Sequence, residues 1–237
     1  MKNILLASTS SLHGDSYLNY LKHELVRLFK DIEEIIFIPY ARPGGINHEA
    51  YTEKAASFFS TIGKQVRGLE SFSNPAQALR EGVAFFTGGG NTFLLVKTLW
   101  EQGLMEVLQQ EVNRGKVYLG TSAGSNIGGI SMQTTNDMPI VYPPTFKTAG
   151  WVPFNINPHY LDPDPLSTHN GETRETRILE FLSQEDTPVV GLREGSWLRI
   201  TGHHITTEGQ HPSRIFEKDK TPYELSPGTT LLFRKEY

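Results

Sequence analysis

The chain of 237 residues contains no cysteine at all. This absence excludes disulfide bonds, a thiolate-ligated zinc site and a cysteine nucleophile. Basic residues are not in excess either, since the formal net charge is −4, and this argues against nucleic acid as a partner. No apolar run approaches the length of a membrane-spanning helix, and the apolar N-terminal stretch is too short for a signal peptide. We therefore expect a cytoplasmic protein with no membrane partner.

Hydrophobic residues make up 38% of the chain, enough for a substantial core, and the length fits one domain spanning 1–237. Strand and helix signals alternate through the first half, and the longest helical pattern covers 93–110. This alternation predicts an α/β fold with a mostly parallel, flavodoxin-like central sheet and helices on both faces. Short antiparallel strands are expected toward the C-terminus, at 197–200, 204–207, 214–218 and 230–234.

The segment Gly120-Thr121-Ser122-Ala123-Gly124 directly follows an apolar run at 117–119. A buried strand that ends in G-x-S-x-G and continues into a helix is typical of a nucleophile elbow. Glycine is needed on both sides because a side chain there would clash in so tight a turn. The turn exposes the hydroxyl of Ser122 and places the N–H of Ala123 where an oxyanion would form. The pattern indicates chemistry through an acyl-serine, although alone it also fits a flexible turn.

A second glycine cluster, Gly88-Gly89-Gly90, follows the strand expected at 83–86. In parallel α/β sheets, ligands bind at the carboxyl ends of the strands. If the two strands are neighbours, this cluster and the serine turn face each other across one crevice. The region 131–170 is long for a loop inside a compact domain, which suggests a functional role.

A serine hydroxyl needs a base, and the base needs an acceptor that orients it. Of the eight histidines, His159 is the preferred candidate because it ends a strand-like stretch and follows the serine in chain order. A loop histidine held by the preceding proline is the alternative. Either of two carboxylates could orient the imidazole: Glu194, which follows the apolar run at 189–192, or Asp137, in a polar loop before Pro139. Both also fit as turn residues, and the residues themselves do not decide between them.

Six blocks, in order along nearly the whole chain, resemble the peptidase E family of aspartyl dipeptidases. They are GGGNTF at 88–93, GTSAG at 120–124, TTNDMPI at 134–140, INPH at 156–159, GETRE at 171–175 and GLREG at 191–195. The resemblance implies a fold like that of class I glutamine amidotransferases, with serine in place of their cysteine. It also implies hydrolysis of dipeptides whose N-terminal residue is aspartate, with neither cofactor nor metal.

The resemblance assigns roles to the candidate catalytic residues. It implies that Ser122 is the nucleophile and His159 the base. Glu194 falls on the third member of the family's triad, and Asp137 falls on another acid that has also been assigned to the charge relay. We therefore favour Glu194 as the orienting group and leave Asp137 as catalytic or substrate-positioning.

The resemblance also places the residues that would bind the substrate. The N–H groups of Gly90 and Ala123 would form the oxyanion hole. Arg174 would bind the aspartyl side chain, since a guanidinium matches a carboxylate with two parallel hydrogen bonds, although it also fits as a surface residue on a helix. Thr121 stands where close family members carry tryptophan, and the loop 161–167 differs in length and composition, so the breadth of specificity is open.

Three other functions compete with this prediction. A cyanophycinase-like or other β-aspartyl peptide hydrolase would use the same triad. An amidotransferase subunit would normally need the cysteine that this chain lacks. A catalytically inactive protein that binds small molecules would need none of the triad candidates. The sequence predicts small dipeptides as partners and leaves the oligomeric state undetermined.

Overall fold

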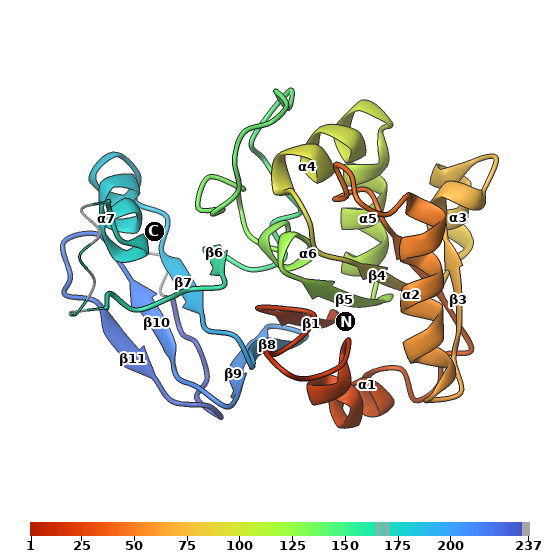
Figure 1. Ribbon diagram of the computed structural model, residues 1–237, viewed down its shortest axis with the longest axis horizontal. Coiled ribbons are helices and arrows are strands. Elements are labelled where there is room, and N and C mark those ends of the chain that lie inside the picture. The colour runs from red at the N-terminus through yellow and green to blue at the C-terminus, as the bar shows by residue number, and fades with distance from the viewer. Residues whose placement is uncertain (165, 167, 169–170, 234–237) are drawn as a thin grey trace.

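Seven strands form the central sheet of the computed structural model, which describes residues 1–164, 166, 168 and 171–233 (Figure 1). In spatial order they are β3 (Gln65–Gly68), β2 (Glu34–Ile38), β4 (Ala84–Thr87), β5 (Val117–Thr121), β1 (Asn3–Ala7), β8 (Ser196–Thr201) and β9 (His204–Gly209). The first five run parallel, whereas β8 and β9 extend the sheet in antiparallel fashion beyond β1. The prediction of a mostly parallel sheet with antiparallel strands from the C-terminal part is confirmed.

Helices cover both faces of this sheet, as predicted. They are α1 (Lys22–Leu28), α2 (His48–Ser60), α3 (Pro75–Glu81), α4 (Thr92–Glu101), α5 (Leu104–Asn113) and the short α6 (Ala123–Asn126). Successive side chains of a strand point to opposite faces, so Leu5 packs with α1 and α2 while Ile4 packs with α4 and α5. Figure 1 shows α1 and α5 on opposite sides of β1 and β5. The inner strands β1, β2, β4 and β5 are mostly apolar because both of their faces are buried.

A second, four-stranded sheet lies beside the first (Figure 1). Its order is β11 (Tyr223–Leu225), β10 (Ser213–Phe216), β7 (Val189–Leu192) and β6 (Asn155–Pro158). Helix α7 (Arg174–Gln184) packs on it through Ile178 and Leu182. Because β7 leads directly into β8 of the central sheet, residues 193–195 lie at the junction of the two sheets.

Two expected elements differ from those observed. The helical pattern at 93–110 is divided into α4 and α5, because Gly103 takes a left-handed conformation with φ of 64°. No strand forms in the described part of 230–234: Thr230 makes only an isolated bridge to Thr206, and Arg234 lies outside the described residues. Within the part of the chain that the structure describes, no helix is both long and apolar enough to cross a membrane.

Candidate active site

Ser122 occupies a sharp turn between β5 and α6. Its backbone has φ of 54° and ψ of −114°, a conformation that is uncommon and strained for any residue but glycine. The flanking glycines are required by contact distances. A Cβ on Gly120 would lie 2.3 Å from the carbonyl oxygen of Gly124, and one on Gly124 would lie 2.1 Å from that of Thr87. The strand, strained serine and helix therefore have the geometry of a nucleophile elbow.

His159 follows the last residue of β6 and lies against the serine. Its Nε2 is 2.9 Å from Ser122 Oγ, and its Nδ1 is 2.7 Å from Glu194 Oε1. The backbone N–H of His159 donates to the hydroxyl of Ser8, which in turn donates to the carbonyl of Leu192. A proton held on Nδ1 by Glu194 leaves Nε2 free to accept the serine proton. The role of Ser8 is not predictable from the sequence, because nothing near it in the sequence marks the bond to His159.

Asp137 lies elsewhere, at the N-terminal end of α4. Its Oδ2 accepts hydrogen bonds from the N–H of Thr92 at 2.7 Å, from the Thr92 hydroxyl at 2.6 Å and from the Thr135 hydroxyl at 3.0 Å. A carboxylate at this point satisfies a free N–H group of the first helical turn and interacts favourably with the helix dipole. Among the described residues it makes no hydrogen bond to His159. The structure thus brings Glu194, rather than Asp137, to the imidazole.

The glycine cluster faces the serine, because β4 and β5 are neighbours in the sheet. A Cβ on Gly89 would lie 2.9 Å from the Cβ of Ser122. Gly90 has φ of 147°, and a Cβ there would lie 2.1 Å from the carbonyl oxygen of Ala41, so only glycine fits. In the described part of the chain, the N–H of Gly90 has no hydrogen-bond acceptor. Ala123 is the first residue of α6, and first-turn N–H groups lack an acceptor within their helix.

Arg174 is the first residue of α7 and lines a cavity of about 670 Å³ together with His159 and Glu194. Its Nη1 is buried and has no hydrogen-bond partner within the described residues. Burial lowers the pKa of the Arg174 guanidinium, and the charge of Glu194 opposes that shift. A buried guanidinium nitrogen without a partner can bind an anionic group that enters the cavity.

A second arginine of the same cavity is fully engaged. The guanidinium of Arg193 bonds to both carboxylate oxygens of Asp162, at 2.8 and 2.7 Å, and to both of Glu224, at 2.9 and 2.8 Å. It also donates to the carbonyl of Pro212 at 2.6 Å. These carboxylates raise the pKa of Arg193, and Arg193 lowers the pKa of Asp162. The network ties the segment after His159 to the second sheet, and no motif in the sequence predicts it.

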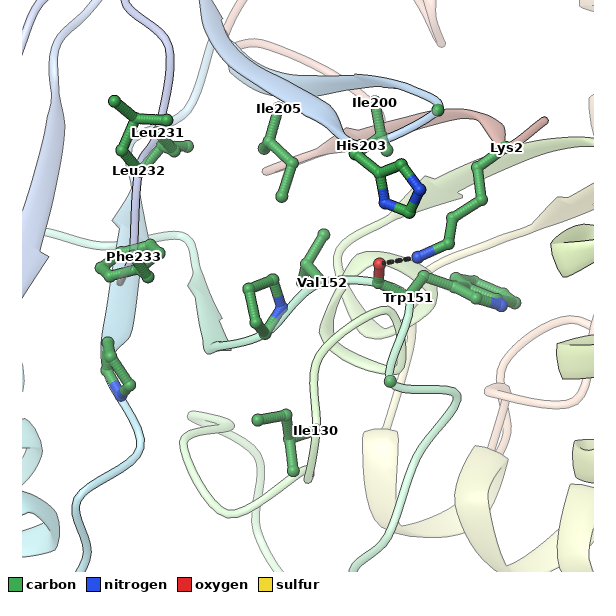
Figure 2. Close-up of a pocket in the computed structure, with 14 residues that line it drawn as sticks. Lys2, Ile130, Trp151, Val152, Ile200, His203, Ile205, Leu231, Leu232 and Phe233 are labelled. Atoms are coloured by element: carbon green, nitrogen blue, oxygen red, sulfur yellow. Dashed lines mark hydrogen bonds between the residues drawn. The ribbon is translucent and has the colours of Figure 1, made fainter. Parts of the chain in front are cut away.

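A different cavity, of about 630 Å³, lies where β1 begins and contains none of the predicted site residues. In Figure 2 the ammonium of Lys2 points to the carbonyl of Trp151, at 2.6 Å, with the ring of His203 beside it. Burial lowers the pKa of Lys2. Across the described residues, no group of three or more His, Asp or Glu side chains could hold a metal ion.

Comparisons with known proteins agree along nearly the whole chain. The model of peptidase family S51 matches residues 4–208. Peptidase E of Streptomyces coelicolor is 45% identical over 229 residues, which cover 97% of this chain and 93% of that protein. A Drosophila melanogaster protein named "Probable alpha-aspartyl dipeptidase" is 43% identical over 235 residues, covering 98% and 97%. The solved structure of a peptidase from an acI-B1 actinobacterium shares the fold, with a TM-score of 0.73, 16% identity and coverage of 98% and 97%.

Proposed function

Since the chain belongs to peptidase family S51, we propose that it is a serine-type dipeptidase that hydrolyses dipeptides with N-terminal aspartate. The observation that carries the proposal is the hydrogen-bonded series Ser122, His159 and Glu194, with distances of 2.9 and 2.7 Å. The names of the two relatives, peptidase E and probable alpha-aspartyl dipeptidase, support the substrate class.

The proposed reaction proceeds through an acyl-serine. His159 Nε2 removes the proton from Ser122 Oγ as this oxygen attacks the scissile carbonyl carbon. The carbonyl oxygen becomes an oxyanion and accepts hydrogen bonds from the N–H groups of Gly90 and Ala123. The imidazolium, held by Glu194, donates its proton to the leaving amine as the C–N bond breaks. Water, deprotonated by His159, then attacks the acyl-serine, releases aspartate and restores the serine hydroxyl.

Arg174 is the group that we propose to bind the aspartyl carboxylate. Both arginines of the 670 Å³ cavity could supply positive charge, but the guanidinium of Arg193 is already bonded to two carboxylates and a carbonyl. The buried Nη1 of Arg174 has no partner in the described part of the chain. A substrate carboxylate would satisfy it, which favours aspartate over a neutral side chain.

The experiment that tests the proposal is hydrolysis of five peptides by the purified protein: Asp-Leu, Glu-Leu, Asn-Leu, isoAsp-Leu and Asp-Leu-Leu. We expect cleavage of Asp-Leu, little cleavage of the others, and nearly complete loss of activity in Ser122→Ala. Preference for isoAsp-Leu would assign the chain to the β-aspartyl hydrolases instead. No cleavage of any peptide would favour the binding-protein alternative. Cytoplasmic location stays a prediction of the sequence.

A further inference from the structure

The peptide that joins Gly89 to Gly90 is held by a buried tyrosine. The hydroxyl of Tyr51 donates a hydrogen bond of 3.2 Å to the carbonyl of Gly89. In a trans peptide the C=O and the following N–H point in opposite directions, and the described residues contain no cis peptide. The N–H of Gly90 therefore points away from Tyr51. It is the N–H assigned above to the oxyanion hole.

Tyr51 is itself firmly fixed in the core. It belongs to α2 and is fully buried. Its ring packs edge-on against Phe37, with centroids 4.9 Å apart, and the guanidinium of Arg42 lies 4.4 Å from its ring centre. A Cβ on Gly88 would lie 2.3 Å from the phenol oxygen, so the glycine loop rests directly on the hydroxyl. Burial raises the pKa of Tyr51, and the hydroxyl therefore stays protonated and able to donate.

The residues that follow in the loop are held by other groups. The N–H of Asn91 donates to the carbonyl of Ala41 at 2.7 Å, and Thr92 is bound by Asp137. The hydroxyl of Tyr51 thus acts on the Gly89–Gly90 peptide itself rather than on the whole loop. A hydrogen bond accepted by a peptide carbonyl also polarises that peptide and strengthens its N–H as a donor.

We propose that Tyr51 is a positioning residue of the oxyanion hole, whose hydroxyl holds the Gly89 carbonyl and so aims the Gly90 N–H at the oxyanion. The inference rests on the proposed function. Tyr51 acts through the Gly89–Gly90 peptide and has no role in proton transfer. Its contribution therefore exists only once negative charge develops on the substrate oxygen, and it affects the transition state more than substrate binding.

The test is Tyr51→Phe, which keeps the ring and removes the hydroxyl. Losing an oxyanion donor outright costs roughly 100- to 1,000-fold in kcat, and since the donor here is only misdirected we expect about a 10-fold loss. KM for Asp-Leu should stay within about twofold, because uniform binding is unchanged. The aldehyde analogue of aspartate, which forms a hemiacetal on the serine, should lose affinity by the same factor as kcat. Free aspartate should bind as it does to the parent.

A control variant must remove a tyrosine hydroxyl that does not contact Tyr51. Because Tyr17 interacts with Tyr51 itself, Tyr223→Phe serves as this control instead. The hydroxyl of Tyr223, on β11, donates to Glu217 at 3.0 Å and, within the described part of the chain, makes no hydrogen bond to a residue of the proposed site. Its removal should leave kcat and aldehyde affinity at the parent values. In the parent protein, formation of the aldehyde adduct should also shift the amide proton resonance of Gly90 downfield, a readout that needs no variant.

Several results would overturn the inference. They are an unchanged kcat and aldehyde affinity in Tyr51→Phe, a raised KM with unchanged kcat, or a Gly90 resonance that does not respond to the aldehyde. Labelling of Ser122 by a fluorophosphonate separates this inference from the proposed function. If the parent cleaves no dipeptide but is labelled, the substrate proposal fails, and labelling about 10-fold slower in Tyr51→Phe still supports the positioning role. Equal labelling rates, or no labelling of the parent, overturn it.

Discussion

Replacing Glu194 by glutamine tests which acid orients the imidazole. Glu194 Oε1 lies 2.7 Å from His159 Nδ1, where a carboxylate keeps the proton on Nδ1 and stabilises the imidazolium that forms during the reaction. Glutamine fills the same space but carries no charge, and its amide can present an N–H to Nδ1 and so favour the wrong tautomer. We expect kcat to fall while the free energy of unfolding stays close to that of the parent.

The size of the loss follows from the exposure of the pair. Two unit charges 4 Å apart interact by about 1 kcal/mol in water and about 4 kcal/mol near a protein surface. The side chains of His159 and Glu194 are 34% and 50% exposed, so solvent screens part of this interaction. The lost imidazolium stabilisation and some wrong tautomer together predict a decrease in kcat of about 100-fold, below the roughly 10,000-fold loss seen when a buried aspartate is replaced in such a triad.

The assay is kcat and KM for Asp-Leu in Glu194→Gln, with thermal unfolding of the same samples. Glu217→Gln is the matched control, because Glu217 bonds only to Lys220 and Tyr223 within the described residues, and it should match the parent. A Glu194→Gln protein with kcat within twofold of the parent would refute the reasoning. So would a well-folded Asp137→Asn protein with the larger loss, which would return the orienting role to Asp137.

Three further predictions concern charged residues outside the catalytic pair. Arg174→Ala should lower kcat/KM for Asp-Leu by about 10- to 100-fold, the worth of a charged hydrogen bond, and should change Ala-Leu hydrolysis little; an equal loss on both peptides would make Arg174 structural. Asp137→Ala should lower the free energy of unfolding, measured in urea, by about 1–2 kcal/mol, because the first turn of α4 loses its acceptor at Thr92; an unchanged urea midpoint would contradict this. Arg193 lowers the pKa of Asp162 in the folded state. The pair therefore stabilises the fold at a pH above about 3.9, the pKa of Asp162 in the unfolded chain. This stabilisation is lost as the pH falls through the lower pKa of Asp162 in the folded protein. The Tm of Asp162→Asn should therefore fall less than that of the parent when the pH drops below about 4. The difference should correspond to less than about 1 kcal/mol, since the carboxylate is exposed.

The sequence predicts the part of the site that residues close together in the sequence form. The turn at Ser122 depends on the preceding strand and on glycines two residues to either side, and all of these residues lie within the pattern. The glycine cluster and the serine turn were expected to face each other if β4 and β5 are neighbours, and the two strands do pair in the sheet. The break of the long helical pattern was not predicted, because a single glycine such as Gly103 is tolerated inside many helices.

The choice between the two acids required contacts between distant parts of the chain. Glu194 and His159 are 35 positions apart, and their contact exists because β6 and β7 pair in parallel and end at the same edge. Asp137 lies closer to His159 in sequence, yet its loop crosses to the start of α4 and binds Thr92. No periodicity or motif in the sequence encodes which of the two loops reaches the imidazole.

The catalytic geometry is in this sense a property of the junction between the two sheets. Ser122 extends from the central sheet, whereas His159 and Glu194 extend from the ends of β6 and β7 in the second sheet. The fully buried Ser8 follows β1 and connects them: its N–H donates to Ser196, its hydroxyl donates to Leu192, and the same hydroxyl accepts from the N–H of His159. The N–H and the hydroxyl of this one residue thereby join the ends of four strands beside the nucleophile. Because every group that Ser8 binds is a backbone group at the end of a strand, the strands themselves help to fix the position of the base relative to the nucleophile.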